Sequence, residues 1–287
     1  MYEEFYGLRE KPFSILPDPE FLYWGRAHSM AFAMLEYGIL NQAGFTVITG
    51  EVGCGKTTLV RHLLNNIGDN ITVGLISNTE NDPRELLQWV LHSFDQPFEG
   101  ASHVANYAAL QRFCEEQHAR GRRSALIVDE AQNLGSGALE QLRMLSNINT
   151  EKHQLLQLIV VGQPELKTLL QRPELRQFAQ RVSSDFHLGP LGYREVVGYI
   201  DHRLAIAGQH LPLFSDEAIE AIYEFSKGIP RIVNILCDTA LVYGFSGHAR
   251  EISRSIVEDV INDKREHGVF EVDADKSYPR NVDVLAR

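Results

Sequence analysis

The sequence has few cysteines and no long apolar run. Its three cysteines, Cys54, Cys114 and Cys237, are widely separated, and no two have the spacing of a zinc site. They indicate free thiols in a reducing compartment and exclude a disulfide-stapled fold. No run of about 18 apolar residues is present, and the start MYEEFYGLREKPF lacks the features of a signal peptide. We therefore expect a cytoplasmic protein without a transmembrane segment, which can still dock on a membrane complex.

Positive charge is also scarce. Lysine and arginine total 27 against 38 aspartates and glutamates, which leaves a net charge of −11. A protein that binds nucleic acid through bulk charge is expected to be basic, so this balance disfavours that mode. Two small basic clusters remain, Arg120, Arg122 and Arg123 in one and Arg26 with His28 in the other. Solvated loop charge is the simpler interpretation of both.

The composition is otherwise that of a globular protein. Hydrophobic residues make up 44% of the 287 residues and charged residues 23%, which is enough apolar material for a sizeable core. These values exclude a wholly disordered or collagen-like chain. A chain of this length is expected to form two units.

Short runs rich in Val, Ile and Leu alternate with helical patterns over the first two thirds of the chain. The first four runs, apolar on both faces as in strands buried from both sides, and a shorter fifth run cover residues 45–49, 71–77, 124–129, 155–161 and 185–188. Helical spacing occurs at 27–40 and 56–66. The alternation predicts an α/β fold with a five-stranded parallel sheet between helices, an αβα sandwich.

Strand patterns stop after Pro190. Helical patterns follow at 193–207, 216–225, 230–243 and 253–264, and Ser215 is a candidate N-cap for the second of them. We predict an α/β core at 1–190 that includes an aromatic lead segment (1–40), then a helical domain at 191–267. Residues 268–287 lack sustained periodicity and are predicted to be a disordered tail.

A phosphate-loop motif follows the first predicted strand and opens a predicted helix. Its residues, Gly50-Glu51-Val52-Gly53-Cys54-Gly55-Lys56-Thr57, fit G-x-x-x-x-G-K-[ST], and Thr58 follows. The glycines let backbone N–H groups turn toward phosphate oxygens, and the helix N-terminus adds positive potential. Lys56 is expected to contact the β- and γ-phosphates, and the Thr57 hydroxyl to ligate Mg²⁺. Cys54 is either a redox switch or a small packing residue, and we favour packing.

Polar side chains follow two later strands. Asp129 and Glu130 end the run SALIVDE, where ligands of parallel sheets gather. We expect Asp129 to hold Mg²⁺ and Glu130 to polarise the water that attacks the γ-phosphate, which favours hydrolysis over static binding. Gln163 follows the fourth strand, in LIVVGQPE. We expect its side chain between the phosphate loop and Asp129, where it orients the water or senses the γ-phosphate.

These motifs together resemble an AAA+ ATPase, and more narrowly the ATPase domain of the ExeA (general secretion pathway protein A) family. The resemblance covers about residues 1–265. The stretches that carry it are FYGL-x-x-KPFS-x-x-PDP-x-FLY, EYGI, ITGEVGCGKTTL, LIVDEAQNL, VVGQPEL, LRQFAQRV, YIDHRLAIAG and GIPRIVNILCDTAL. It implies ATP and Mg²⁺ as cofactors, a helical lid, and self-association into a ring or filament.

The resemblance also implies roles for residues outside the phosphate loop. Arg231 corresponds to the lid arginine, and it lies in the first turn of a helix that Pro230 begins. Arg181 is our candidate for an arginine finger supplied to a neighbouring subunit, with Arg176 as the second candidate. Tyr23 and His28 are expected to contact the adenine base. Most other aromatics of the lead segment are interpreted as core packing.

Two classes of function are consistent with these features. The first is an assembly or regulatory ATPase for a cell-envelope machine, in secretion, pilus formation or polysaccharide export, peripheral at the inner membrane. Longer ExeA-type proteins continue into a membrane span and a peptidoglycan-binding domain, so a chain ending soon after the lid looks closer to the short soluble relatives. The second is a DNA-associated helper ATPase, as in transposition. A static nucleotide-bound scaffold is disfavoured by Glu130.

Overall fold

The computed structural model describes residues 1–40, 44–77, 83–98, 100, 102–148 and 154–267. The predicted disordered tail at 268–287 lies outside these residues. The chain divides into two compact units. One is Arg26–Gly189, and the other combines Met1–Gly25 with the chain from Pro190 onward.

The first unit, Arg26–Gly189, is built on the predicted five-stranded parallel sheet. Its strands lie in the order β2-β3-β4-β1-β5, and every pairing is parallel. Their bounds are β1 (Phe45–Gly50), β2 (Ile71–Ile76), β3 (Arg123–Val128), β4 (Leu156–Gly162) and β5 (Val182–Leu188). Because all strands run the same way, their carboxyl ends meet at one edge of the sheet, and this edge carries the phosphate loop.

Burial differs between central and edge strands. β1 and β4 are buried along their whole length, and β3 along all but its first residue. β2 and β5 are the edge strands and are only partly buried. The prediction that residues 71–77 are buried on both faces is therefore wrong, because a strand at the edge of a sheet lacks a neighbour on one side.

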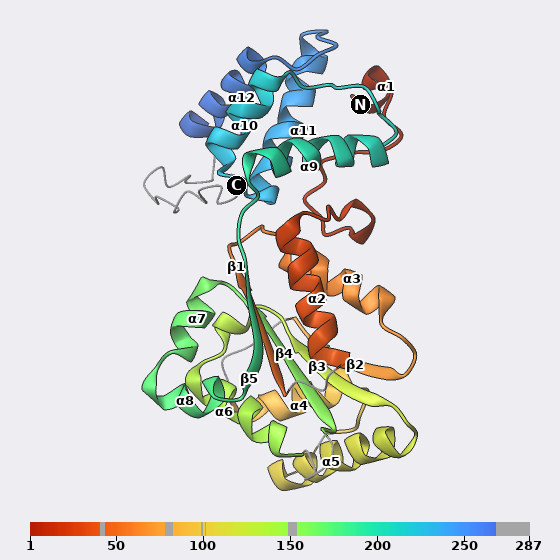
Figure 1. The fold of residues 1–287 in the computed structure, drawn as a ribbon, viewed down its shortest axis with the longest axis vertical. Helices are drawn as coiled ribbons and strands as arrows, with labels where there is room; N and C mark the ends of the chain where they lie inside the picture. The colour runs from red at the N-terminus through yellow and green to blue at the C-terminus, as the bar shows by residue number, and fades with distance from the viewer. Residues whose placement is uncertain (41–43, 78–82, 99, 101, 149–153, 268–287) are drawn as a thin grey trace, which may run out of the picture. The chain divides into compact units, whose positions relative to one another are not determined.

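Helices cover both faces of the sheet, which confirms the αβα sandwich (Figure 1). One face carries α2 (Arg26–Leu40) and α3 (Lys56–Asn66), the helix that the phosphate loop opens. The other face shares one apolar cluster with α4 (Pro83–Ser93), α5 (His103–Ala119), α6 (Ser136–Leu145), α7 (Pro164–Leu170) and α8 (Arg176–Ala179). Apolar residues on both faces of the central strands thus fix the phosphate loop on a rigid layer.

The second unit is helical, as predicted for the region after Pro190. It contains α1 (Glu3–Tyr6), the 3₁₀ helix η1 (Pro19–Phe21), α9 (Tyr193–Ile206), α10 (Asp216–Ser226), α11 (Pro230–Ser246) and α12 (Arg254–His267). Ser215 caps α10, since its hydroxyl accepts a hydrogen bond from the Ala218 N–H at 3.2 Å.

The N-terminal segment belongs to the helical unit, and this differs from the predicted core at 1–190. Residues 1–25 group with the chain from Pro190 onward. Tyr2, Tyr6, Phe13 and Phe21 are each at most 4% exposed, and they share one apolar cluster with α9, α10, α11 and α12. Burial of large aromatic side chains is strongly favourable, so the segment packs on the helical unit, whose apolar core includes its rings.

A buried arginine also fastens this segment to the helical unit. Arg203 of α9 is 6% exposed and donates to the Pro12 carbonyl oxygen and, at 2.8 Å, to the Tyr199 hydroxyl. The Tyr199 hydroxyl in turn donates to Asn234 Oδ1 of α11 at 2.8 Å. Asn234 Nδ2 donates to the Ser14 carbonyl oxygen at 3.2 Å. The buried charge is thus satisfied by the segment that it holds.

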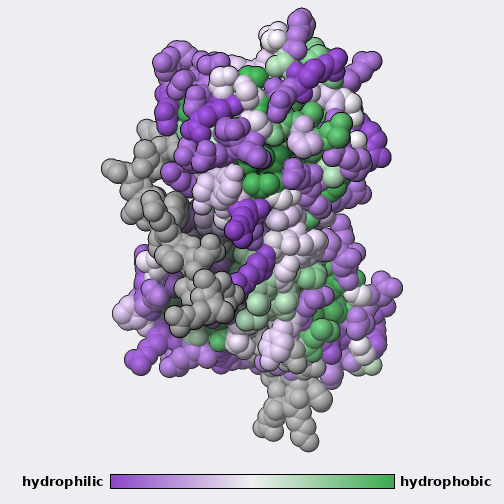
Figure 2. All heavy atoms as spheres, turned by 45° about the horizontal axis from the view of Figure 1, so that its top comes forward, coloured by the Kyte–Doolittle hydropathy of each residue, from purple (hydrophilic) through white to green (hydrophobic). Residues whose placement is uncertain are grey.

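The visible surface in Figure 2 is covered largely by hydrophilic side chains, with hydrophobic patches between them. Among the described helices, none is both long and apolar enough to cross a bilayer.

Candidate nucleotide-binding site

Two glycines determine the path of the phosphate loop. A Cβ atom on Gly50 would lie 2.4 Å from the Leu188 carbonyl oxygen of the neighbouring strand β5, so only glycine fits there. Gly55 is the N-cap of α3 and has a φ of 94°, in the left-handed region that glycine adopts without strain. The chain therefore leaves β1 in close contact with β5 and turns sharply into α3.

Lys56 folds back over the loop. Its side chain is buried, and its ammonium group donates to the carbonyl oxygens of Gly50 at 2.7 Å and Glu51 at 3.0 Å. These two bonds hold the positive charge beside the loop, where phosphate oxygens would be its stronger acceptors. Thr57 and Thr58 are half-buried in the first turn of α3, whereas Val52 at the tip of the loop is 51% exposed.

Cys54 packs beneath the loop. Its side chain is fully buried, and burial raises the pKa of the thiol to about 12 although Lys56 lies near. A thiol with so high a pKa is protonated at neutral pH and is a poor nucleophile. The packing role expected for Cys54 agrees with this environment, and a redox switch does not.

His28 of α2 contacts the back of the same loop. It is 4% exposed, and its Nε2 lies 2.9 Å from the Cys54 carbonyl oxygen. A carbonyl oxygen only accepts, so Nε2 carries the proton and donates. In the structure His28 contacts the loop backbone, and its expected contact with the adenine base stays a prediction. Its position suits support of the loop.

Replacing His28 by Leu is expected to weaken nucleotide binding about 2- to 10-fold, since it removes one buried hydrogen bond worth about 0.5–1.5 kcal/mol to the loop. Titration calorimetry with ATP and Mg²⁺ measures the change. His118→Leu, at an exposed position in the same unit, is the matched control. Equal affinities for both variants would mean that the loop keeps its shape without His28.

Asp129 lies directly across from Thr57. The Thr57 hydroxyl donates to Asp129 Oδ2 at 2.9 Å, and the Glu130 N–H donates to Asp129 Oδ1 at 2.9 Å. Neighbouring ligands of an octahedral Mg²⁺ with bonds of about 2.0–2.1 Å are about 2.9 Å apart, and Mg²⁺ prefers such oxygen donors. Thr57 and Asp129 therefore fit a magnesium ion that arrives with a nucleotide.

The environment of Asp129 also suits a bound cation. The residue is 4% exposed, and burial raises the pKa of its carboxyl group, with the nearby Glu130 charge acting in the same direction. Hydrogen bonds from Thr57 and the Glu130 N–H lower it in part. A buried carboxylate that is costly to ionise gains most from a divalent cation.

Glu130 is held by two glutamine side chains. Its backbone has a φ of 52°, a left-handed conformation that is uncommon outside glycine and is often found at functional sites. Its Oε2 accepts hydrogen bonds from Gln132 Nε2 at 2.6 Å and from Gln163 Nε2 at 3.1 Å. The Gln163 N–H donates to Gln132 Oε1 at 2.9 Å, which closes the group. Sequence reasoning gave Gln132 no role, although it lies within the quoted LIVDEAQNL stretch.

The strand order explains how these residues meet. Asp129 and Glu130 follow β3, Gln163 follows β4, and the phosphate loop follows β1. Because β4 lies between β3 and β1, Gln163 lies between the acidic pair and the loop, as expected. Lys56, Thr57, Asp129, Glu130 and Gln163 therefore gather at the carboxyl edge of one sheet.

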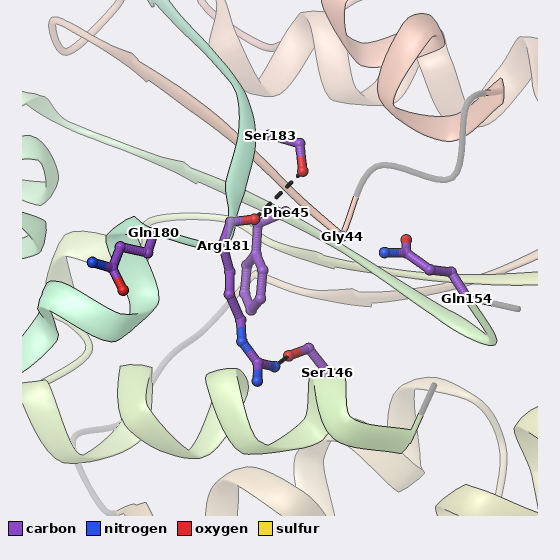
Figure 3. Close-up of a pocket in the computed structure, with 7 residues that line it drawn as sticks. All are labelled: Gly44, Phe45, Ser146, Gln154, Gln180, Arg181 and Ser183. Carbon is purple, nitrogen blue, oxygen red and sulfur yellow. Dashed lines mark hydrogen bonds between the residues drawn. The ribbon is translucent and has the colours of Figure 1, made fainter. Parts of the chain in front are cut away.

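Arg181 lies at the amino ends of the strands, opposite the carboxyl ends that carry the phosphate loop. It precedes β5, and it lines a polar cavity of about 360 Å³ with Gly44, Phe45, Ser146, Gln154, Gln180 and Ser183. Figure 3 shows its side chain extended toward Ser146, and its guanidinium donates to the Ser146 hydroxyl and, at 3.4 Å, to the Arg143 carbonyl oxygen. Arg176, the second candidate, is exposed at the start of α8.

Tyr23 and Arg231 belong to the helical unit. Tyr23 is half-buried against α9, with its ring centroid 6.0 Å from that of Tyr199, and Gly198 leaves the room that its hydroxyl needs. Arg231 is exposed in the first turn of α11. The turn before it is tight, because a Cβ on Gly228 would lie 1.9 Å from the Leu191 carbonyl oxygen. Their roles toward a nucleotide stay predictions.

Comparison with known proteins agrees with this geometry. Residues 39–170 match the model of a family described as an AAA domain. General secretion pathway protein A of Aeromonas hydrophila is 40% identical over 253 residues, which cover 88% of this chain and 46% of that protein. The chain therefore spans about half the length of this relative.

Solved structures with similar folds are more distant in sequence. The ORC2 protein of Aeropyrum pernix, in ADPNP–ADP complexes, aligns with a TM-score of 0.66 at 15% identity over 88% of this chain and 71% of that one. The RuvB Holliday junction branch migration motor of Thermotoga maritima aligns with a TM-score of 0.55 at 18% identity over 90% of this chain and 76% of that one. At such identities the likeness concerns the fold alone.

Proposed function

Because residues 39–170 match an AAA domain and the chain is 40% identical to general secretion pathway protein A over 253 residues, we propose that it hydrolyses Mg²⁺·ATP to assemble or regulate a cell-envelope machine. The observation that carries the proposed hydrolysis is the placement of Glu130. Its carboxylate is held by Gln163 beside a loop and an Asp129–Thr57 pair suited to phosphate and Mg²⁺.

The roles of the site residues follow from their chemistry. The loop N–H groups and the Lys56 ammonium bind the phosphates and neutralise their charge. Thr57 and Asp129 would hold a magnesium ion, which would supply neutralisation of phosphate charge. Glu130 accepts a proton from the attacking water while the bond from the γ-phosphorus to the ADP oxygen breaks. Gln163 donates its amide N–H to the water or the γ-phosphate.

The position of Arg181 favours a nucleotide site that a second subunit completes. Arg181 precedes β5, whereas the phosphate loop adjoins the far end of that strand at Leu188. A strand of this length spans about 20 Å, so Arg181 cannot contact the nucleotide of its own chain. We therefore assign it to the nucleotide of a neighbouring copy, which implies activity only in an assembled ring or filament.

The Arg181→Ala variant is expected to bind ATP almost normally and to hydrolyse it at least about 10²-fold more slowly, because its charge matters most in the transition state. The wild-type rate per subunit should rise with protein concentration. A mixture of Arg181→Ala and Lys56→Ala chains should recover activity, since one chain supplies an intact loop and the other an intact arginine. Steady-state phosphate release measures all three.

Two controls keep this test specific. Arg172→Ala, at an exposed position in the same unit, should match the wild type. Arg181 also donates hydrogen bonds to Ser146 and Arg143, so the substitution can lower stability as well as activity. Melting temperatures of the variant and the wild type distinguish a loss of stability from the loss of the arginine finger. If the two inactive chains co-assemble without any recovery, Arg181 is not the finger and Arg176 is tested next.

The envelope role is tested by nucleotide-dependent localisation. The Glu130→Gln chain, held in its ATP-bound state, is expected to sediment with inner-membrane fractions of its host, whereas Lys56→Ala is not. Equal sedimentation of both chains would contradict an ATP-dependent envelope partner.

The DNA-associated alternative is disfavoured by the residues that suggested it. Arg123 donates to the Ile39 and Leu40 carbonyl oxygens at 3.0 and 3.1 Å, and Arg120 lies 3.6 Å from Glu116. Duplex binding that persists from about 50 to 200 mM salt would favour this alternative over the envelope role.

A further inference from the structure

Gln132 lies between the ends of β3 and β4 and has no role in the mechanism proposed above for ATP hydrolysis. It belongs to the 3₁₀ helix η2 (Ala131–Asn133), directly after Glu130 and Ala131. Its amide nitrogen donates to Glu130 Oε2 at 2.6 Å, and its amide oxygen accepts from the Gln163 N–H at 2.9 Å. One side chain therefore contacts both residues that surround the attacking water in the proposed function.

The backbone leaves room for this contact. Gly162 is the last residue of β4, and a Cβ atom there would lie 2.9 Å from Gln132 Oε1 and 2.8 Å from Leu166 Cδ2. Any larger residue at this position would press against the Gln132 amide. The glycine thus lets a side chain from the β3 exit cross the end of β4.

Gln132 and Gln163 both donate a side-chain amide N–H to Glu130, but the two amides are held differently. Gln163 has a side-chain amide that can turn to a phosphate oxygen, and doing so would break its 3.1 Å bond to Glu130. Gln132 has its own oxygen fixed by a backbone N–H, so its amide nitrogen keeps one direction. Gln132 is therefore the donor that stays on Glu130 when Gln163 leaves.

We propose that Gln132 is a positioning residue. It holds the Glu130 carboxylate in its reactive orientation while the Gln163 amide leaves Glu130 and forms a hydrogen bond with the γ-phosphate. The inference rests on the proposed hydrolysis of ATP by Glu130. It adds a residue that acts through Glu130 and does not touch the nucleotide. Misplacement of a catalytic group by about 1 Å can cost about 10²-fold in rate, which sets the scale of the effect.

The test uses two variants of Gln132 whose side chains have similar shape, one apolar and one negatively charged. Gln132→Met removes both hydrogen bonds, and Gln132→Glu keeps the acceptor but replaces the donor by a second carboxylate beside Glu130. Both are expected to lower kcat by about 10–100-fold, with the KM and Kd for ATP within about 2-fold of the wild type. A merely structural role would lower the affinity for ATP together with kcat. Gln171→Met and Gln171→Glu, at an exposed position in the same unit, are the matched controls.

A double-mutant cycle with Gly162 provides a second measurement. Gly162→Ala should lower kcat in the wild type, because the new methyl group displaces the Gln132 amide, but should add little to Gln132→Met. Full additivity of the two losses would contradict the proposal. Melting temperatures of all variants identify a loss that comes from unfolding.

The outcomes separate this inference from the function on which it rests. If Glu130→Gln is inactive and both Gln132 variants turn over at the wild-type rate, Gln132 has no positioning role and the proposed hydrolysis stands. If Glu130→Gln is as active as the wild type, both assignments are wrong. If the Gln132 variants lose kcat and ATP affinity together, Gln132 supports the fold of the site only, and the inference is overturned.

Discussion

Replacing Glu130 by Gln is expected to slow ATP hydrolysis by about 10²–10⁴-fold while ATP and Mg²⁺ still bind. The amide has nearly the shape of the carboxylate but does not accept the water proton. The phosphate loop, Thr57 and Asp129 are unchanged, so nucleotide affinity should be retained. Single-turnover hydrolysis separates the chemical step from product release, and titration calorimetry measures affinity.

The control for this variant is Glu36→Gln, an exposed carboxylate on α2 of the same unit. It removes the same charge from the unit without touching the site, and its rate should equal that of the wild type. A Glu130→Gln chain that also turns over at the wild-type rate would remove Glu130 from the mechanism and leave a nucleotide-binding scaffold as the better description.

Replacing Lys56 by Ala is expected to weaken ATP binding by about 100-fold or more. Charged hydrogen bonds contribute about 1.5–3 kcal/mol each, and the ammonium group is expected to make more than one with the phosphates. The variant also loses the bonds from Nζ to the Gly50 and Glu51 carbonyl oxygens. Both losses act at the phosphate loop, so affinity is the quantity that should fall, as measured by titration calorimetry.

Lys167→Ala, at an exposed position of α7, is the matched control. Its ATP affinity should not change. The AMP affinity of Lys56→Ala should fall much less than its ATP affinity, because AMP lacks the phosphates that Lys56 contacts. Unchanged ATP affinity in Lys56→Ala would overturn the phosphate-loop assignment.

The chemistry at the ends of the strands could be predicted from the amino-acid sequence. Strand and helix periods are local, and so is the order of residues around each turn, which is why the loop at 50–57 and the pair Asp129 and Glu130 were placed correctly at strand exits. The alternation of strands and helices was enough to predict a parallel sheet, because a parallel connection needs a helical crossover.

Tertiary structure decided what each of these side chains contacts. Sequence patterns do not encode the direction of Glu130, which depends on a left-handed φ of 52° and on amides that arrive from η2 and from the end of β4. They likewise do not reveal the contact of His28 with the Cys54 carbonyl oxygen, which joins residues 26 positions apart.

Long-range packing also decided where the N-terminal segment belongs. Its aromatic spacing predicts burial but does not specify the partner, and residues 1–25 complete the helical core in place of the sheet. The physical reason is the same in each case. Periodicity reports which side chains avoid water, whereas the choice of partner depends on shape and on the hydrogen bonds that only the assembled core supplies.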